Sequence, residues 1–83
     1  MANLGTFTVQ TNGTYKTLAE VTDLTFTEGN SYQIQILNMA YLREGTTGGG
    51  FLVDNSTPIK YTATSDDLYI KNNYGACVVN ISE

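Results

Sequence analysis

The sequence predicts an all-β protein, a single small antiparallel β-sandwich or barrel of roughly eight short strands. Two observations support this fold class. Apolar and polar residues alternate along one segment after another, which is the period of a half-buried strand. Turn-forming residues separate these segments, and Asn12-Gly13 is the clearest turn because both residues accept the positive φ of a tight hairpin. With no linker and no internal repeat, residues 1–83 are predicted to form one domain.

The alternating segments give the expected strands in order. They are "TFTVQ", "LTFT" and "YQIQI" before the glycine-rich segment, and "FLVD", "IKYT", "LYIK" and "CVVNI" after it. One turn of helix is expected between Leu18 and Val21. The predicted core consists of the inward residues of the strands, which are Phe7, Phe26, Ile34, Ile36, Phe51, Val53, Ile70 and Val79.

The composition leaves a small core without the usual reinforcements. Only 41% of the residues are hydrophobic and tryptophan is absent, so the apolar area that can be buried is modest. Cys77 is the only cysteine, which excludes an internal disulfide, and the absence of histidine removes the usual nitrogen ligands of zinc or copper. Self-association is therefore the expected source of additional stability.

The charge distribution argues against nucleic acid as a partner. Four basic residues stand against eight acidic ones, giving a net charge of −4. A phosphate backbone is bound by clustered Lys and Arg, which Lys16, Arg43, Lys60 and Lys71 are too few to provide. The first residues lack the features of a signal peptide, and no segment approaches the ~18 apolar residues needed to cross a bilayer. We expect synthesis in a host cytoplasm and no membrane partner.

No motif predicts an enzyme. In "GTTGGGFLVDNSTPIKY" the glycines lead into a strand, whereas a phosphate-binding loop leads into a helix and ends in Lys followed by Ser or Thr. A cysteine or serine nucleophile lacks a histidine base, and Cys77 alternates with Val79 and Ile81, as a buried thiol would. Asp66-Asp67 and Asp54-Asn55 could supply oxygen ligands to calcium, but turn capping is the expected role. We predict no cofactor and no metal.

One segment, "YQIQILNMAYL", is apolar on both faces. Its inward set is expected to continue through Asn38, Ala40 and Leu42, which leaves other apolar residues on the opposite face. Either a loop of the same chain covers that face, a bulge resets the alternation, or another subunit covers it. The adjacent glycines would permit close approach of a neighbouring subunit. The candidate subunit interface is Leu37, Met39, Tyr41, Gly45, Gly48, Gly49 and Gly50.

The order of motifs over the last two thirds of the chain resembles small β-structured virion proteins of tailed bacteriophages. The matching pieces are Tyr32 to Gln35, Glu44-Gly45, Gly50 to Val53, Pro58, Asp67 to Lys71 and Val79 to Glu83. The resemblance implies a non-enzymatic structural protein of the virion, such as a capsid decoration or cement protein. It would form a homo-oligomer, with a trimer expected, and bind the major capsid protein or another virion protein.

Two alternatives remain open at this point. The chain could be a neck, tail or fibre component of a phage, which the same resemblance allows. It could also be a small carbohydrate- or cell-surface-binding module, because tyrosine rings can stack on sugars. The tyrosines available for stacking are Tyr15, Tyr41, Tyr69 and Tyr74.

Overall fold

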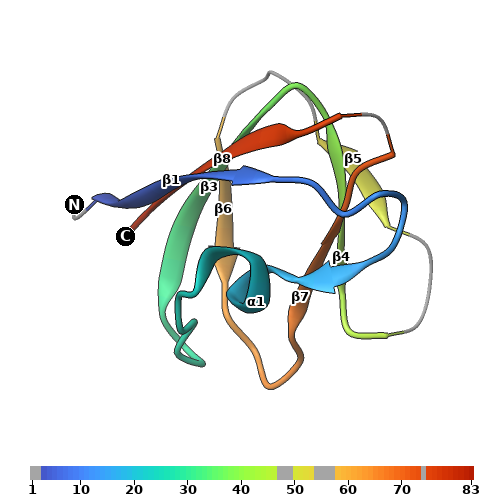
Figure 1. Ribbon diagram of the computed structural model, residues 1–83. Coiled ribbons are helices and arrows are strands. Elements are labelled where there is room, and N and C mark those ends of the chain that lie inside the picture. The colour runs from blue at the N-terminus through green and yellow to red at the C-terminus, as the bar shows by residue number, and fades with distance from the viewer. Residues whose placement is uncertain (1–2, 47–49, 54–57, 74) are drawn as a thin grey trace.

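The computed structural model describes residues 3–46, 50–53, 58–73 and 75–83, and it confirms the all-β fold class (Figure 1). The described residues form two antiparallel sheets of four strands each and one short helix. In chain order these elements are β1 (Asn3–Val9), β2 (Lys16–Thr17), α1 (Leu18–Thr22), β3 (Ser31–Leu37), β4 (Ala40–Glu44), β5 (Phe51–Val53), β6 (Ile59–Thr62), β7 (Leu68–Lys71) and β8 (Cys77–Ser82).

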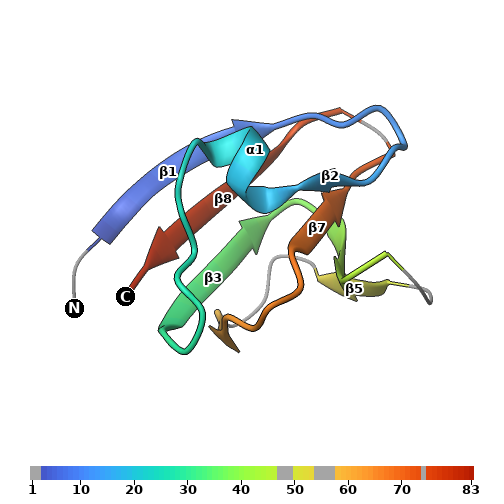
Figure 2. The same ribbon diagram turned by 90° about the horizontal axis from the view of Figure 1, so that it is seen from below.

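The chain passes repeatedly from one sheet to the other. Sheet A has the strand order β1-β8-β3-β6, and sheet B has the order β2-β7-β4-β5. Each of the connections from β1 to β2, from β3 to β4, from β5 to β6 and from β7 to β8 therefore changes sheets. Figures 1 and 2 show the two sheets as separate layers, with β5 at the outer margin of the molecule in both views.

The doubly apolar segment is not one strand, as the sequence suggested, but two strands in different sheets. The break falls at Asn38, whose φ of +73° lies in the left-handed region that asparagine tolerates better than most residues. Asn38 is exposed rather than inward, and its side-chain amide donates to the carbonyl of Ala76 at 3.0 Å. Beyond this corner the predicted alternation holds, because Ala40 and Leu42 are buried.

The core lies between the sheets and is built from the inward residues of both. Of the predicted core residues, Ile34, Ile36, Val53, Ile70 and Val79 are buried. Phe7 and Phe26 are partly buried and pack against this core. The prediction for Phe51 is wrong, since its side chain is 54% exposed. It pairs with Leu42 of β4 and so faces the core side, but β5 is the edge strand of sheet B, where the core ends.

Helix α1 confirms the helical turn expected around Leu18 to Val21 and packs beside β1 (Figure 2). The hydroxyl of Thr17 caps it by accepting a hydrogen bond from the N–H of Glu20 at 3.2 Å. The helix ends at Asp23, whose φ is +60° and whose N–H donates to the carbonyl of Ala19. Leu18, which is fully buried, anchors this short helix in the core.

Asn72 and Thr11 tie the two sheets together at the end of the sandwich where β1 leaves sheet A and β7 leaves sheet B. The Asn72 side chain is 2% exposed, and its Oδ1 accepts from the N–H of Thr11 at 2.6 Å. Its Nδ2 donates to the carbonyls of Val9 at 2.8 Å and Gly75 at 2.9 Å. The backbone of Asn72 accepts from the N–H of Gly13 at 2.8 Å. One buried amide therefore satisfies backbone groups of two separate loops.

We predict that Asn72→Ala lowers the free energy of unfolding by about 2–4 kcal/mol, because it leaves backbone groups of Thr11, Val9 and Gly75 buried without partners. Urea unfolding followed by circular dichroism measures this loss. Asn73→Ala is the matched control, since Asn73 is exposed, and it should change the stability by less than about 0.5 kcal/mol. Equal losses in the two variants would contradict the role given to Asn72.

Candidate functional site

The outer face of sheet B carries aromatic and basic side chains that alternate across the strands. The register pairs Arg43 of β4 with Tyr69 of β7, and Tyr41 of β4 with Lys71 of β7. Because directly paired residues point to the same face and their inward neighbours are buried, all four side chains point outward. The ring of Tyr15, just before β2, covers the same face. We call this set of five residues the tyrosine face.

Cation–π contacts hold the tyrosine face together. The Arg43 guanidinium carbon lies 3.9 Å from the centre of the Tyr15 ring and 5.4 Å from that of Tyr69. The Lys71 ammonium lies 4.8 Å from the Tyr15 ring centre and 5.2 Å from that of Tyr41. Such contacts are worth roughly 0.5–1 kcal/mol each at exposed sites. Two of the four basic residues of the chain are thus fixed on one face of one sheet.

The Tyr15 ring of the tyrosine face leaves no room for a side chain at position 50. A Cβ atom at Gly50 would overlap the Tyr15 hydroxyl and would lie 2.9 Å from the carbonyl oxygen of Leu42, which is closer than side chains normally approach. The Tyr15 ring therefore rests against the chain at the start of β5. The docking role that the sequence analysis assigned to this glycine stays a prediction, and the structure adds a contact inside the chain.

An apolar surface continues from the tyrosine face around β5. Leu52 pairs with Tyr41 and is 50% exposed, and Met39, two residues before Tyr41, is 57% exposed. Met39 directly precedes Ala40, which pairs with Val53, so Met39 lies at the end of sheet B where Leu52 is exposed. Phe51 extends this surface over the edge of the sheet. Leu37 is 38% exposed and lies on sheet A, opposite Val78 of β8.

The structure places the residues of the predicted subunit interface in three different settings. Leu37 and Met39 are exposed, as predicted, and Tyr41 is half-buried beside Lys71. Gly45 has a φ of +78°, and its N–H donates to the carbonyl of Asp67 at 2.8 Å, so the turn itself requires glycine. Gly48 and Gly49 lie outside the described residues. Sequence alternation alone did not identify Leu52 as part of this surface, since that required the pairing of β5 with β4.

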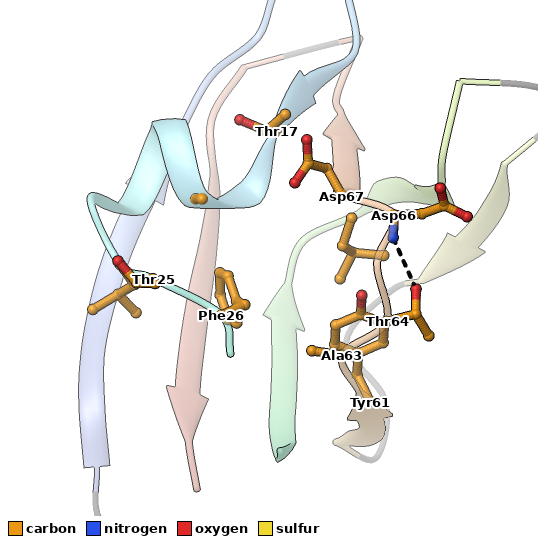
Figure 3. Close-up of a pocket in the computed structure, with 11 residues that line it drawn as sticks. Thr17, Thr25, Phe26, Tyr61, Ala63, Thr64, Asp66 and Asp67 are labelled. Carbon is orange, nitrogen blue, oxygen red and sulfur yellow. Dashed lines mark hydrogen bonds between the residues drawn. The ribbon is translucent and has the colours of Figure 1, made fainter. Parts of the chain in front are cut away.

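A cleft of about 200 Å³ opens between the segment that follows α1 and the turn from β6 to β7 (Figure 3). Phe26 and Tyr61 contribute aromatic rings to its lining, and Thr17, Asp66 and Asp67 contribute polar groups. Figure 3 shows the Asp67 carboxylate on the side of Thr17 and the Asp66 carboxylate on the opposite side of the turn. Sites for drug-sized ligands measure roughly 300–1,000 Å³, so this cleft has room for about one small ring.

The polar groups that line the cleft are suited to forming hydrogen bonds. Burial, and then the negative charge of Glu44, raises the pKa of Tyr61 above its usual 10.0, so its hydroxyl stays protonated at neutral pH. The Thr64 hydroxyl donates to Glu44 at 3.0 Å and accepts from the N–H of Asp66 at 3.2 Å. The Thr64 hydroxyl therefore caps this turn, and the capping role expected for the Asp66 and Asp67 side chains stays a prediction. Asp54 and Asn55, the other candidate calcium pair, lie outside the described residues.

Cys77 is fully buried, as predicted from its alternation with Val79 and Ile81. Burial raises the pKa of its thiol above the usual 9.0, against the smaller opposing effect of nearby hydrogen-bond donors, which include Asn72. A reactive cysteine has the opposite character, with a lowered pKa and an accessible sulfur.

Neither a search of the structure for metal clusters and membrane helices nor a comparison with known proteins assigns a function. Within the described residues, no group of three or more Cys, Asp or Glu side chains is arranged to hold a metal ion. No helix in the described ranges has the length and apolar character needed to cross a membrane. Compared with protein-family models, curated proteins and solved structures, the chain has no significant match in any of the three.

We predict that the buried thiol of Cys77 makes stability depend on pH in the alkaline range. Its pKa is higher in the folded than in the unfolded state, so its contribution is fully present below pH 9 and is lost as the pH rises further. Urea unfolding at pH 7 and pH 10 should show a larger loss for the wild type than for Cys77→Ala. All other side chains are the same in both proteins, so their contributions cancel in this comparison. An equal loss in the two proteins would show that the thiol is not protected from ionisation.

Proposed function

We propose that this chain is a non-enzymatic structural protein of a tailed-phage virion, a capsid decoration protein that binds other proteins through the outer side of sheet B. One observation carries the proposal. The outward residues within β4, β5 and β7 are aromatic, basic and apolar, and none of them is a carboxylate, although the chain has twice as many acidic as basic residues. The one described carboxylate beside these strands is that of Asp67, which directly precedes β7. The two main parts of this outward surface are the tyrosine face and the exposed pair Met39 and Leu52.

This composition favours a protein partner. Tyr, Arg and Met are enriched at the centres of protein interfaces, where a few of them supply most of the binding energy. The rings and cations of the tyrosine face already hold one another in place, so they lose little conformational entropy when a partner covers them. Met39 and Leu52 add apolar area that water would leave on binding.

The outer side of sheet A is mostly polar. Thr6 donates to Asn80 at 2.7 Å, and Asn80 donates to Gln35 at 3.1 Å, which forms a hydrogen-bonded row across β1, β8 and β3. Gln33 and Thr8 continue this polar surface, while Lys60 opposite Gln33 is basic, and Leu37 and Val78 form an apolar end. Side chains that satisfy one another and face water gain little from contact with a partner. The molecule therefore has one side richer in aromatic and apolar groups and one mostly polar side, which suits a subunit seated on a larger surface.

The virion setting rests on the order of motifs from Tyr32 to Glu83 and on the absence of a described catalytic arrangement around Cys77 or the Asp66-Asp67 pair. A decoration protein acts by covering and bridging capsid subunits, which requires adhesive surface rather than chemistry. The same side of sheet B would serve a neck, tail or fibre component. Self-association, for which the sequence analysis expected a trimer, would use the apolar part of the surface.

A second candidate function, binding of a small saccharide, is favoured by the cleft. Aromatic rings beside carboxylates and hydroxyls are suited to sugar rings, whose C–H faces stack and whose hydroxyl groups donate. Phe26, Tyr61 and Asp67 would make these contacts. Of the tyrosines first considered for stacking, Tyr15, Tyr41 and Tyr69 lie together on the tyrosine face, where they contact cations, and Tyr74 lies outside the described residues. Chemical-shift changes confined to the cleft on titration with hexoses would favour this function.

We predict that particles of the phage whose genome encodes this chain contain it in stoichiometric amounts. Mass spectrometry of gradient-purified particles measures this content, and added protein should rebind to particles that lack it. Met39→Asp should weaken rebinding by at least about tenfold, because a carboxylate forced into an apolar contact loses its hydration without a partner.

The control is Gln33→Asp, which introduces the same carboxylate on the exposed outer side of sheet A and should leave rebinding unchanged. Circular dichroism confirms that both variants keep their strands. Particles without the chain, or rebinding that responds to Gln33→Asp and not to Met39→Asp, would contradict the proposal.

A further inference from the structure

The two sheets end in four edge strands, and three of them carry features that discourage pairing with another strand. An edge strand exposes unpaired N–H and C=O groups, which natural proteins protect by shortness, charge, proline or irregular register. The register of β1 shifts at Gly5, where φ is +146°. Strand β2 has two residues, one of them Lys16, and β6 contains Lys60 and follows Pro58.

Strand β5 is also short, but its three residues include no charge and no proline, and it is apolar on both sides. Leu52 points outward and is 50% exposed. Phe51 and Val53 point to the core side, where Val53 is 6% exposed and Phe51 is 54% exposed. A large aromatic side chain on the core side of a sheet is normally covered by the opposite sheet. At the edge of sheet B the opposite sheet does not extend far enough to cover the Phe51 side chain.

We propose that β5 pairs antiparallel with β5 of a second copy of this chain, which joins the two B sheets into one continuous eight-stranded sheet. The proposal specifies how the self-association included in the proposed function would occur. It rests on that self-association and not on the virion setting. The occupant of the edge is a strand, because β5 has no second partner strand among the described residues and its outer edge carries backbone donors and acceptors. A two-fold symmetric contact uses the same surface on both copies and closes on itself.

A second copy fits this edge because β5 is complementary to itself. If the pairing is centred on Leu52, each Leu52 lies opposite the same residue of the other copy on the outer side. Each Phe51 then lies opposite Val53 of the other copy on the core side, so apolar side chains meet on both sides of the new sheet. The added strand would extend the core layer to Phe51, which this chain alone leaves exposed.

Charges within β5 and on the described part of β4 do not oppose this contact, although each copy carries a net charge of −4. Asp54, which follows β5 in the sequence, lies outside the described residues. Strand β5 is uncharged, and the nearest outward charge on the neighbouring strand is Arg43 of β4. Two β4 strands in the joined sheet would be about 14 Å apart, since adjacent strands are spaced by about 4.8 Å. That separation exceeds the Debye length of about 8 Å at physiological ionic strength, so these charges would be largely screened.

The first test is cross-linking through Leu52→Cys. Residues directly opposite in an antiparallel pair have Cβ atoms about 4.5–5.5 Å apart, close to the distance that a disulfide spans. Mild oxidation at micromolar concentration should convert most of this variant to a covalent dimer, read on a non-reducing gel. The matched control is Leu37→Cys, which is also exposed but lies on sheet A and should stay monomeric on the gel. The native Cys77 is buried and takes no part.

The second test is sedimentation of the wild type and of Leu52→Lys. The wild type should sediment as a dimer, and the variant as a monomer with unchanged circular dichroism, because a lysine on an edge strand blocks pairing. A wild-type monomer or trimer, equal cross-linking of the two cysteine variants, or a heteromeric complex through β5 in place of the dimer would overturn the proposal. A dimer that never occupies phage particles would contradict the virion function alone. Occupied particles without β5 pairing would contradict this inference alone.

Discussion

The arrangement of the two sheets depends on the buried side chain of Asn72. Two of the connections that change sheets, from β1 to β2 and from β7 to β8, meet at this residue. The chain has no disulfide with which to fix that meeting point, and the amide takes this role by bonding Thr11, Val9 and Gly75 at once. A buried amide stabilises a structure only when its donors and acceptors are all satisfied, and here they are. The position is therefore specific for asparagine.

The position of the tyrosine face depends on the hydrogen bonds of Asn72. The segment held by Asn72 continues through the Asn12-Gly13 turn to Tyr15, and the position of that turn decides where the Tyr15 ring falls. The ring lies over Arg43 and Lys71, and its hydroxyl rests against Gly50, where β5 begins. Contacts between residues far apart in the sequence therefore connect Asn72, at the end of the sandwich, through Tyr15 to Gly50, which precedes edge strand β5. A change at the Asn72 amide would therefore alter the tyrosine face, which is the surface proposed for binding, without a direct contact between them.

The sequence predicted most of the strands but not their division between sheets. The strand expected over residues 24–27 is wrong, since these residues have no regular secondary structure, and β2 was not predicted. Alternation at Ile34, Ile36, Ala40 and Leu42 predicts inward positions correctly, because burial on one face imposes a period of two. Nothing in that pattern shows that the chain turns a corner at Asn38, since a left-handed asparagine preserves the alternation on both sides of it. The tyrosine face was equally hidden, because Tyr15, Arg43 and Lys71 come together only through strand register. Asn72 appeared within a turn signal, and its buried bonds depend on a loop 61 residues away.

The misplacement of Phe51 has a physical cause that bears on how the protein works. Its inward direction was predicted correctly from the alternation with Val53, but direction does not ensure burial at the last strand of a sheet. A small chain must end its core somewhere, and this one ends it with an aromatic side chain on an uncharged edge. Glycines at the described ends of the preceding loop serve the fold, Gly45 through its positive φ and Gly50 through its contact with Tyr15. In the association proposed through β5, covering Phe51 would complete the core and form the contact in a single step.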